Sequence, residues 1–362
     1  MGVKYTINLL NEKGGIKLIR LNFKNKLFLF LIIIFGIIFL VGCSNNNVEE
    51  TGTQIKEITI GYFPNVTHAP AIVGIEKGIF QQEFDNIKVK TRIFPNGSLF
   101  MDALNTGQID IGYVGPGPAL NRFLQGAEVK ALASASTGGT VLIARRDLEY
   151  QRPEDLKGKI VATPARGCTH DLIFRKMLIE NNLATTDSGG QIEHRTQKPA
   201  TMIGLFAQGQ LDAAMVSEPW ASLMEDEIGA KVVVDWNQVP WDGQLPATIV
   251  VSTNEFINNN PDLIKLFLKG HLKAIDFIKN NPENSVRIIS REISRLTKQK
   301  LSVDVIKRSL DRTYMTAEIK PEILQELADL SAALGFIKGN SSLNGFIDTT
   351  YLKEVLDNVS SQ

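Results

Sequence analysis

Apolar residues follow two patterns along this chain. Residues 27–41 form one continuous apolar run, interrupted only by Gly36. From residue 58 onward, short runs rich in β-branched residues alternate with segments whose apolar residues recur every three or four positions. Such alternation predicts an α/β protein in which crossover helices connect the strands of a parallel sheet. The expected strands are 58–62, 88–94, 109–114 and 129–135, and the expected helices are 69–80, 98–105 and 118–124.

The last third of the chain has the pattern of helices. Pro261 opens a segment whose apolar residues are spaced by three and four, and Pro282 opens another. A third segment at 321–334 stops before Gly335. We expect this helical part to fold back on the N-terminal part of the chain and to have a structural role.

A shift of 102 positions superimposes one half of the α/β region on the other. Gly-Gln-Ile-Asp at 107–110 then meets Gly-Gln-Leu-Asp at 209–212, and Thr-His at 67–68 meets Thr-His at 169–170. Both halves share the order strand, Thr-His loop, helix, strand, helix, Gly-Gln-x-Asp and strand. Because this period is too long for a solenoid, it predicts two similar α/β lobes.

Two apolar runs, at 140–144 and 245–251, are the expected crossovers between these lobes. The first lobe is thus interrupted in sequence by the second. The expected divisions are a leader at 1–43, a flexible tether at 44–54, the first lobe at 55–143 and 247–362, and the second lobe at 144–246.

The apolar run at 27–41 identifies the leader. As a helix its 15 residues would extend about 22 Å, less than the roughly 30 Å of a bilayer's hydrocarbon layer. Basic residues precede it, as in a secretory signal. The sequence Leu-Val-Gly-Cys at 40–43 resembles the lipobox of bacterial lipoproteins, which implies that Cys43 becomes a diacylated N-terminus held to the membrane. The alternative is an uncleaved N-terminal anchor, and both place the rest of the chain outside the cytoplasm.

The net charge and the cysteine content narrow the possible classes of protein further. The whole chain has 39 basic and 39 acidic residues. Removing the basic leader leaves a net charge of about −5, which argues against a nucleic-acid or anionic-membrane surface. Cys168 is the one cysteine beyond Cys43, so no internal disulfide can form in the mature chain.

Helix starts that follow strand ends are the expected binding positions, because their unpaired N–H groups and the helix dipole attract anions. Five such loops occur, at 63–68, 95–98, 115–118, 164–170 and 217–220. The candidate ligand-binding residues in these loops are Asn65, Thr67, His68, Gly97, Ser98, Gly115, Pro116, Arg166, Gly167, Cys168, Thr169, His170, Glu218 and Trp220.

His68 and His170 hold equivalent positions in the two halves, so two imidazoles can donate to one oxyanion across a cleft, or each can tie its own loop to the backbone. Arg166 offers a forked cation for sulfonate or carboxylate oxygens, or is a solvated surface residue. Glu218 suits an anion site poorly; it binds a neutral, cationic or protonated group of the ligand, or bridges the lobes. Trp220 covers a ligand's carbon skeleton or packs between the lobes.

Metal and catalytic signals are weak. The chain has no His-x-x-x-His or Cys-x-x-Cys spacing, no phosphate-binding Walker motif and no dinucleotide fingerprint. Cys168 at a helix start is a candidate nucleophile, but His170 is two residues away and helical positions i and i+2 do not face each other. We therefore expect no cofactor, no metal and no enzymatic activity.

Several segments together resemble the sulfonate, nitrate and taurine branch of bacterial solute-binding proteins, which serve ATP-binding-cassette (ABC) importers. They are 60–65 (Ile-Gly-Tyr-Phe-Pro-Asn), 67–69, 104–115, 155–159, 167–170 and 209–212 leading to 218–220. The resemblance implies a two-lobed periplasmic-binding-protein fold of type II, with a double crossover and a helical C-terminal part. It implies a monomer that closes on a small anionic ligand and delivers it to a membrane permease and its ATPase.

The resemblance places an aliphatic sulfonate first among the substrates. Sulfonate-binding members commonly have Lys-Gly-Ser where this chain has Arg-Gly-Cys at 166–168. The loop at 63–68 also resembles members that bind nitrate or the pyrimidine precursor of thiamine. An enzyme on the same fold, with Cys168 or a histidine as the reacting group, and a co-receptor of a membrane kinase are the rival readings. A transcriptional regulator is disfavoured, because a signal sequence and no helix-turn-helix precedes the domain.

Overall fold

The computed structural model of the chain describes residues 55–360. The predicted leader, the lipid attachment at Cys43 and the tether at 44–54 lie outside the described residues, so they stay predictions. Within residues 55–360, no helix combines the length and the apolar character needed to cross a bilayer.

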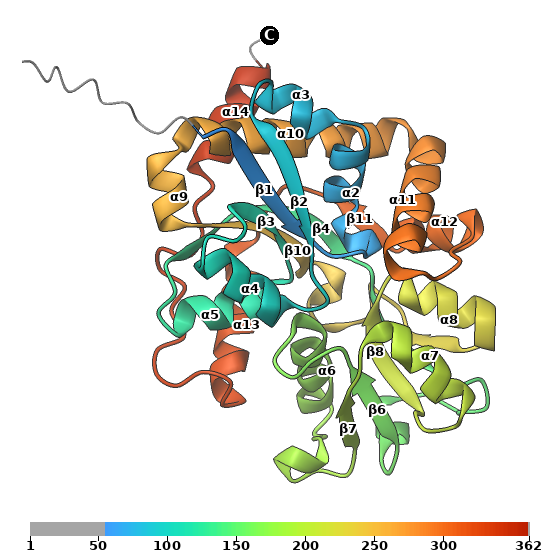
Figure 1. Cartoon of the computed structure of the whole chain (residues 1–362). Helices are drawn as coiled ribbons and strands as arrows, with labels where there is room; N and C mark the ends of the chain where they lie inside the picture. Colours follow the sequence, from blue (N-terminus) through green and yellow to red (C-terminus); the bar gives the residue numbers. More distant parts are fainter. Residues whose placement is uncertain (1–54, 361–362) are drawn as a thin grey trace, which may run out of the picture. The chain divides into compact units, whose positions relative to one another are not determined.

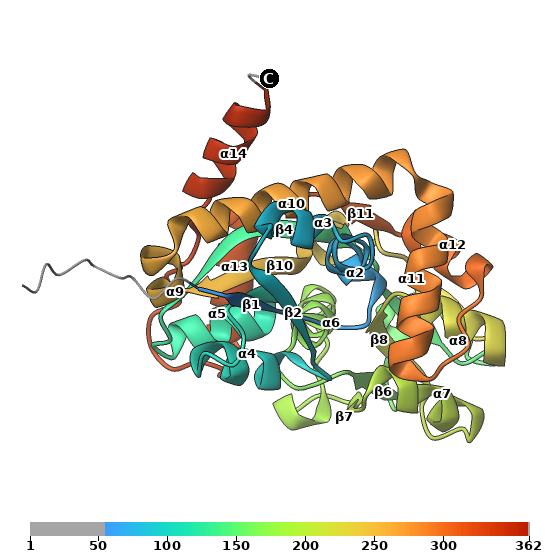
Figure 2. The same cartoon turned by 45° about the horizontal axis from the view of Figure 1, so that its top comes forward.

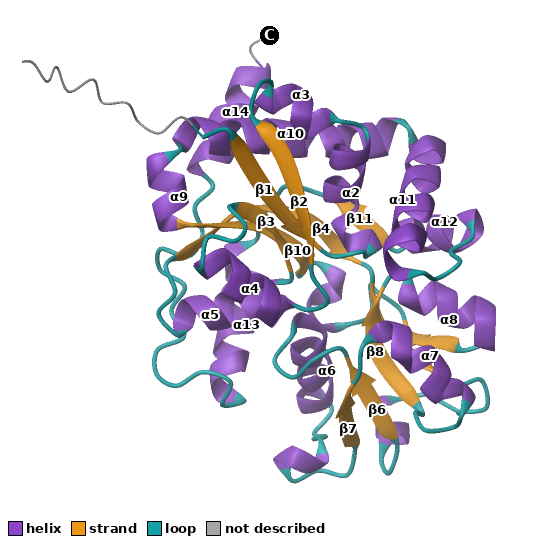
Figure 3. Cartoon of the chain, viewed as in Figure 1, coloured by secondary structure: helices purple, strands orange, loops and turns teal. Residues whose placement is uncertain are grey.

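The described chain contains two β-sheets (Figures 1 and 3). The first has the order β11-β4-β10-β3-β1-β2 and the second the order β7-β6-β8-β5-β9. The first sheet consists of β1 (Glu57–Tyr62), β2 (Lys88–Ile93), β3 (Ile111–Val114), β4 (Val129–Gly138), β10 (Pro246–Thr253) and β11 (Thr313–Met315). The second consists of β5 (Thr140–Ala144), β6 (Ile160–Thr163), β7 (Glu193–Thr196), β8 (Ala213–Ser217) and β9 (Lys231–Val234).

The two sheets repeat one topology, as the shift of 102 positions predicts. Parallel strands β2-β1-β3 correspond to β7-β6-β8, and an antiparallel strand follows each set, β10 in the first sheet and β5 in the second. The repeated aspartates make the same contact. Asp110 accepts a hydrogen bond from the Thr59 amide in the first half of β1 (2.7 Å), and Asp212 accepts one from the Ile160 amide at the start of β6 (2.8 Å).

The chain passes to the second sheet between β4 and β5 and returns between β9 and β10. The predicted boundary at residue 143 is therefore wrong for β5, which pairs with β8 and β9. The apolar residues of a strand predict that the strand is buried, but they do not predict which sheet it joins. Gly138 and Gly139 turn the chain at this crossover with left-handed φ angles of 70° and 65°. A Cβ on Gly138 would lie 2.7 Å from the Arg312 carbonyl oxygen, so the turn favours glycine there.

Helices surround both sheets (Figure 1). The expected helix at 69–80 is two helices, because Gly78 interrupts it with a φ of 68°. The α-helices are α2 (Ala69–Glu76), α3 (Ile79–Phe84), α4 (Gly97–Asn105), α5 (Pro116–Leu124), α6 (Thr169–Glu180), α7 (Pro199–Ala207), α8 (Trp220–Ile228), α9 (Asn254–Asn259), α10 (Pro261–Asn280), α11 (Pro282–Thr297), α12 (Val303–Asp311), α13 (Pro321–Ala333) and α14 (Thr350–Ser360). Short 3-10 helices are η1 (Val66–His68), η2 (Pro153–Leu156), η3 (Thr186–Ser188) and η4 (Pro240–Gly243).

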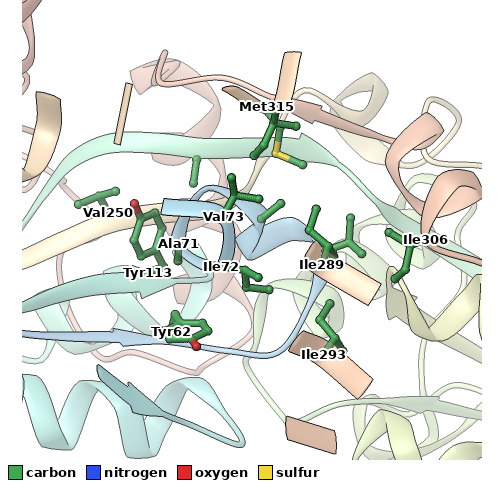
Figure 4. Close-up of a cluster of buried hydrophobic side chains, with 14 of the residues drawn as sticks. Tyr62, Ala71, Ile72, Val73, Tyr113, Val250, Ile289, Ile293, Ile306 and Met315 are labelled. Atoms are coloured by element: carbon green, nitrogen blue, oxygen red, sulfur yellow. The ribbon is translucent and has the colours of Figure 1, made fainter. Parts of the chain in front are cut away.

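The C-terminal helices return to the first lobe, as expected. Helix α10 packs on α2 and α3, and α14 contacts α10 (Figure 2). They cover a core in which aromatic and β-branched side chains from β1, α2, β3, β10 and α11 meet (Figure 4). His271 belongs to this core: its Nδ1 lies 2.9 Å from the Tyr113 hydroxyl and its Nε2 lies 2.8 Å from the Ser134 carbonyl oxygen. Helices α12 and α13 also reach the second lobe, at α8 and α6.

Candidate functional site

A cavity of about 450 Å³ lies between the two lobes. Both lobes contribute walls, and the end of α11 contributes Leu296 and Thr297, so the C-terminal part is more than structural. Phe63, Phe94 and Trp220 give it aromatic faces. Nine of the candidate residues line it: Asn65, Thr67, His68, Gly97, Gly115, Cys168, Thr169, His170 and Trp220.

The two imidazoles lie in this cavity from opposite lobes. His68 ends η1, and the Phe63 amide donates to its Nδ1 (3.4 Å), which leaves the proton on Nε2. Burial lowers the pKa of His68 to about 3, with the nearby His170 as a smaller cause. Burial lowers the pKa of His170, in the first turn of α6, to about 4. Both rings are therefore neutral at pH 7, and each has one N–H for a ligand or a neighbour.

A hydrogen bond between side chains of the two lobes joins two residues that line the cavity. The Trp220 indole Nε1–H donates to the Asn65 Oδ1 at 2.9 Å. Trp220 begins α8 in the second lobe, whereas Asn65 precedes η1 in the first. Trp220 is only 5% exposed. Trp220 therefore packs between the lobes, which is one of its two expected roles, and it also lines the cavity. Its contact with a ligand's carbon skeleton stays a prediction.

The starts of α5 and α6 meet across the lobes through glycines. The Gly117 amide donates to the Thr169 hydroxyl at 3.1 Å. A Cβ on Gly115 would lie 2.6 Å from that hydroxyl, and a Cβ on Gly117 would lie 2.8 Å from the Thr169 amide nitrogen. Pro116, between them, does not line the cavity. This close packing uses the Thr169 hydroxyl for contact between lobes.

A second hollow of about 250 Å³ lies beside the cavity, and Gly97, Ser98, Arg166, Gly167 and Cys168 are among its lining residues. Gly97 and Cys168 line both spaces. The expectation that Arg166 offers its guanidinium to the cavity does not match its placement. Arg166 forms an ion pair with Asp187 of η3 and lies outside the cavity lining.

The chemistry of Cys168 argues against a reactive thiolate. It occupies the position before α6. Burial is the largest cause that raises the pKa of the thiol, to about 12, and the carboxylate of Asp171 adds to it. At neutral pH the thiol is protonated, and a thiol is a poor nucleophile.

Of the roles expected for Glu218, its contacts match a bridge between the lobes. Its carboxylate is fully buried, forms an ion pair with Arg312 (2.9 Å) and accepts hydrogen bonds from the Ser222 amide (3.0 Å) and the Ser309 hydroxyl (3.1 Å). Arg312 and Ser309 come from the C-terminal part of the first lobe, at α12 and just after it. Glu218 does not line the cavity.

Sequence reasoning missed Lys198. It precedes α7, and it is the one charged residue among those that line the cavity. Its side chain is exposed and forms no ion pair with any residue that the structure describes. The repeat contains the signal that finds it: Lys198 lies 102 positions after Asn96, whose side chain caps α4 by accepting from the Leu99 amide. Extending the repeat to α7 gives a sixth helix start.

The described part of the chain holds no group of three or more histidine, cysteine or acidic residues suited to a metal ion. The cavity is therefore a space with apolar and aromatic walls, two neutral imidazoles, several helix starts and a lysine. Such a site can hold a small solute by hydrogen bonds and contact area, and it contains no carboxylate among its lining residues.

Two curated proteins are similar to this chain. A "Putative aliphatic sulfonates-binding protein" of Bacillus subtilis is 26% identical over 336 residues, covering 91% of this chain and 98% of that protein. The taurine-binding periplasmic protein of Escherichia coli is 27% identical over 232 residues, covering 64% and 69%.

Two solved structures share the fold. The alkanesulfonate-binding protein SsuA from Xanthomonas axonopodis pv. citri, bound to MOPS, has a TM-score of 0.69 at 19% identity and covers 81% of this chain and 98% of its own. The periplasmic nitrate-binding protein NrtA from Synechocystis PCC 6803 has a TM-score of 0.72 at 15% identity, covering 85% and 90%. These similarities establish the two-lobed fold of periplasmic binding proteins. Because the family model matches residues 52–293, this chain belongs to the NMT1-like family.

Proposed function

We propose that this protein is the solute-binding component of an ABC importer, and that its cavity captures a small solute bearing an oxyanion, first of all an aliphatic sulfonate. The names of two relatives, "Putative aliphatic sulfonates-binding protein" and "Taurine-binding periplasmic protein", support the proposal. The solute sits between the lobes and touches both, so it stabilises their closed arrangement. The permease then recognises the closed arrangement, which results from rotation about the hinge.

The charge of the cavity lining carries this proposal. No carboxylate lines the cavity, and Lys198 supplies one positive charge at its edge. His68 and His170 are neutral, so each donates a hydrogen bond without the cost of burying a second cation. The starts of α4, α5, α6 and α7 add N–H groups and positive helix ends. A cationic solute would find no counter-charge there.

The size and the walls of the cavity favour a sulfonate over nitrate. Phe63, Phe94 and Leu296 present apolar surface on which an alkyl chain can bury. A bare nitrate ion would use the polar groups but leave most of the space of about 450 Å³ unfilled. The second candidate is the pyrimidine precursor of thiamine, because the faces of Phe63 and Trp220 also suit a flat ring.

The proposed protein performs no chemical reaction on its solute. The protonated thiol of Cys168 supports this, since it removes the strongest candidate nucleophile. The protein acts as a monomer beside the membrane permease and its ATPase, held to the outer face of the cytoplasmic membrane by the lipid on Cys43. The anchor is tested by metabolic labelling with a palmitate analogue, which the variant Cys43→Ala should not incorporate.

Calorimetric titration of the purified protein tests the function. The panel comprises taurine, linear alkanesulfonates, nitrate and hydroxymethylpyrimidine, and the proposal expects an alkanesulfonate to bind most tightly. His68→Ala and His170→Ala should each weaken that binding at least tenfold, because a buried oxyanion loses a donor. Ser98→Ala, which changes only the neighbouring hollow, is the matched control and should keep the affinity. Tightest binding of hydroxymethylpyrimidine would select the second candidate, and no binding by any member of the panel would refute both.

A further inference from the structure

Phe336 connects the two lobes at a place that the cavity does not use. It follows α13 in the first lobe, and its half-buried ring lies against the second hollow. The guanidinium carbon of Arg166 lies 5.6 Å from the centre of this ring, and that of Arg175 lies 5.7 Å from it. Both arginines belong to the second lobe. At these distances each guanidinium is attracted by the ring face.

The same ring covers Gly167. A Cβ added there would lie 3.3 Å from the Phe336 Cδ1, so the ring is in close contact with this backbone. From the first lobe, Asn121 also donates its Nδ2–H to the Gly167 carbonyl oxygen (3.2 Å), while Ser331 of α13 donates to the Asn121 Oδ1 (2.5 Å). Two groups of the first lobe, Phe336 and Asn121, thus contact Gly167 of the second.

Residues of the second lobe contact Gly167 as well. Asp171 accepts from the Gly167 amide (2.7 Å) and from the Arg175 Nε (2.9 Å). Asp187 bridges Arg175 (3.0 Å) and Arg166. Only 4% of the Arg175 side chain is exposed. Two carboxylates balance the two guanidiniums, so the cations keep a fixed position without an uncompensated buried charge.

We infer that Phe336 is a positioning residue for solute binding: it clasps the loop 166–170 when the lobes close, and thereby sets the affinity for every solute. This inference rests on the proposed function. Phe336 does not line the cavity, so it acts through the loop that carries Cys168, Thr169 and His170. Its contacts join residues of different lobes, and the inference requires that they break when the lobes open. A contact present only in the closed state raises the closed population, and the apparent affinity rises in proportion.

The test uses Phe336→Ala and the milder Phe336→Leu, which keeps apolar packing without the ring face. With its contacts to Arg166 and Arg175 removed, Phe336→Ala should weaken binding about tenfold for each solute that the wild type binds. Phe336→Leu should give an intermediate loss. The matched control is Tyr351→Ala, whose ring receives Lys265 at 5.8 Å wholly within the first lobe and which should leave affinity unchanged.

Two further measurements distinguish the loss of this contact between the lobes from a general loss of structure. The double variant Arg166→Ala with Phe336→Ala should lose less affinity than the product of the single losses, because the same contact is removed once. Small-angle X-ray scattering of the solute-free protein should show a larger radius of gyration for Phe336→Ala than for the wild type. Unchanged affinity, a loss confined to one solute, additive losses or unchanged scattering would overturn the inference. If the wild-type protein binds no solute but the scattering difference persists, the proposed function is refuted. The inferred contact of Phe336 between the lobes is not refuted by that result.

Discussion

Gly117→Ala should weaken solute binding while leaving the fold intact. Gly117 lies in the first turn of α5, where this helix meets the start of α6. Its added Cβ would lie 2.8 Å from the Thr169 nitrogen, 3.1 Å from the Cys168 carbonyl carbon and 3.2 Å from the Gly167 oxygen. All three are backbone atoms of the other lobe, so no side chain can rotate away. The lobes must separate by several tenths of an ångström.

The magnitude follows from the cost of overpacking. One extra methyl group in a tight contact costs about 1–3 kcal/mol. If that cost falls on the closed state alone, it lowers the affinity about 5- to 150-fold. In a solute-free protein free to open slightly, the first lobe is unaffected, and alanine is a better helix former than glycine. The thermal midpoint of the solute-free protein should therefore not fall.

Calorimetric titration and thermal melting of the same samples measure the two effects. The matched control is Gly204→Ala in α7, where an added Cβ meets nothing within 4 Å. This variant should keep wild-type affinity. Equal affinities of Gly117→Ala and wild type would refute the reasoning, because they would mean that α5 and α6 are not in contact when solute is bound.

Three other predictions follow from the charges and burial of the site. Lys198→Ala should lower alkanesulfonate affinity by up to about fivefold and flatten its salt dependence while sparing neutral solutes; an unchanged salt dependence contradicts this. Burial lowers the pKa of His68 to about 3 and of His271 to about 4, below 6.5, so the unfolded chain takes up protons first. Stability should then fall as pH drops from about 6.5 toward 4, whereas thermal midpoints that stay constant over that range would contradict it. Iodoacetamide at pH 8 should label Cys168 far more slowly in folded than in urea-unfolded protein; equal rates would revive a reactive thiol.

Much of the fold was predictable because the chain repeats itself. The Gly-Gln-x-Asp segments, 102 positions apart, mark the same turn in both lobes, where Asp110 and Asp212 each accept a hydrogen bond from a backbone amide of the neighbouring strand. The sheet to which β5 belongs was not predictable, since its apolar residues would be buried equally well in either sheet. The break at Gly78 was also missed, because the apolar spacing continues past it into α3.

The sequence predicts those site residues whose placement depends only on where a helix starts. His68 and His170 enter the cavity because the repeat places them at equivalent starts. The placement of Arg166 and Glu218 depends on their ion-pair partners, Asp187 and Arg312. No local sequence pattern connects these partners with them. The contacts of Phe336 could not be predicted for the same reason, because they come from residues 161 to 170 positions earlier in the chain.

A crystal structure of the protein with its tightest-binding solute from the panel tests the central claim most directly. The account predicts the anionic group between the two lobes, within hydrogen-bond distance of the imidazoles of both His68 and His170, with its carbon skeleton against Trp220. A solute bound to one lobe only, or outside the cavity, with the two imidazoles facing solvent apart from each other, would contradict it.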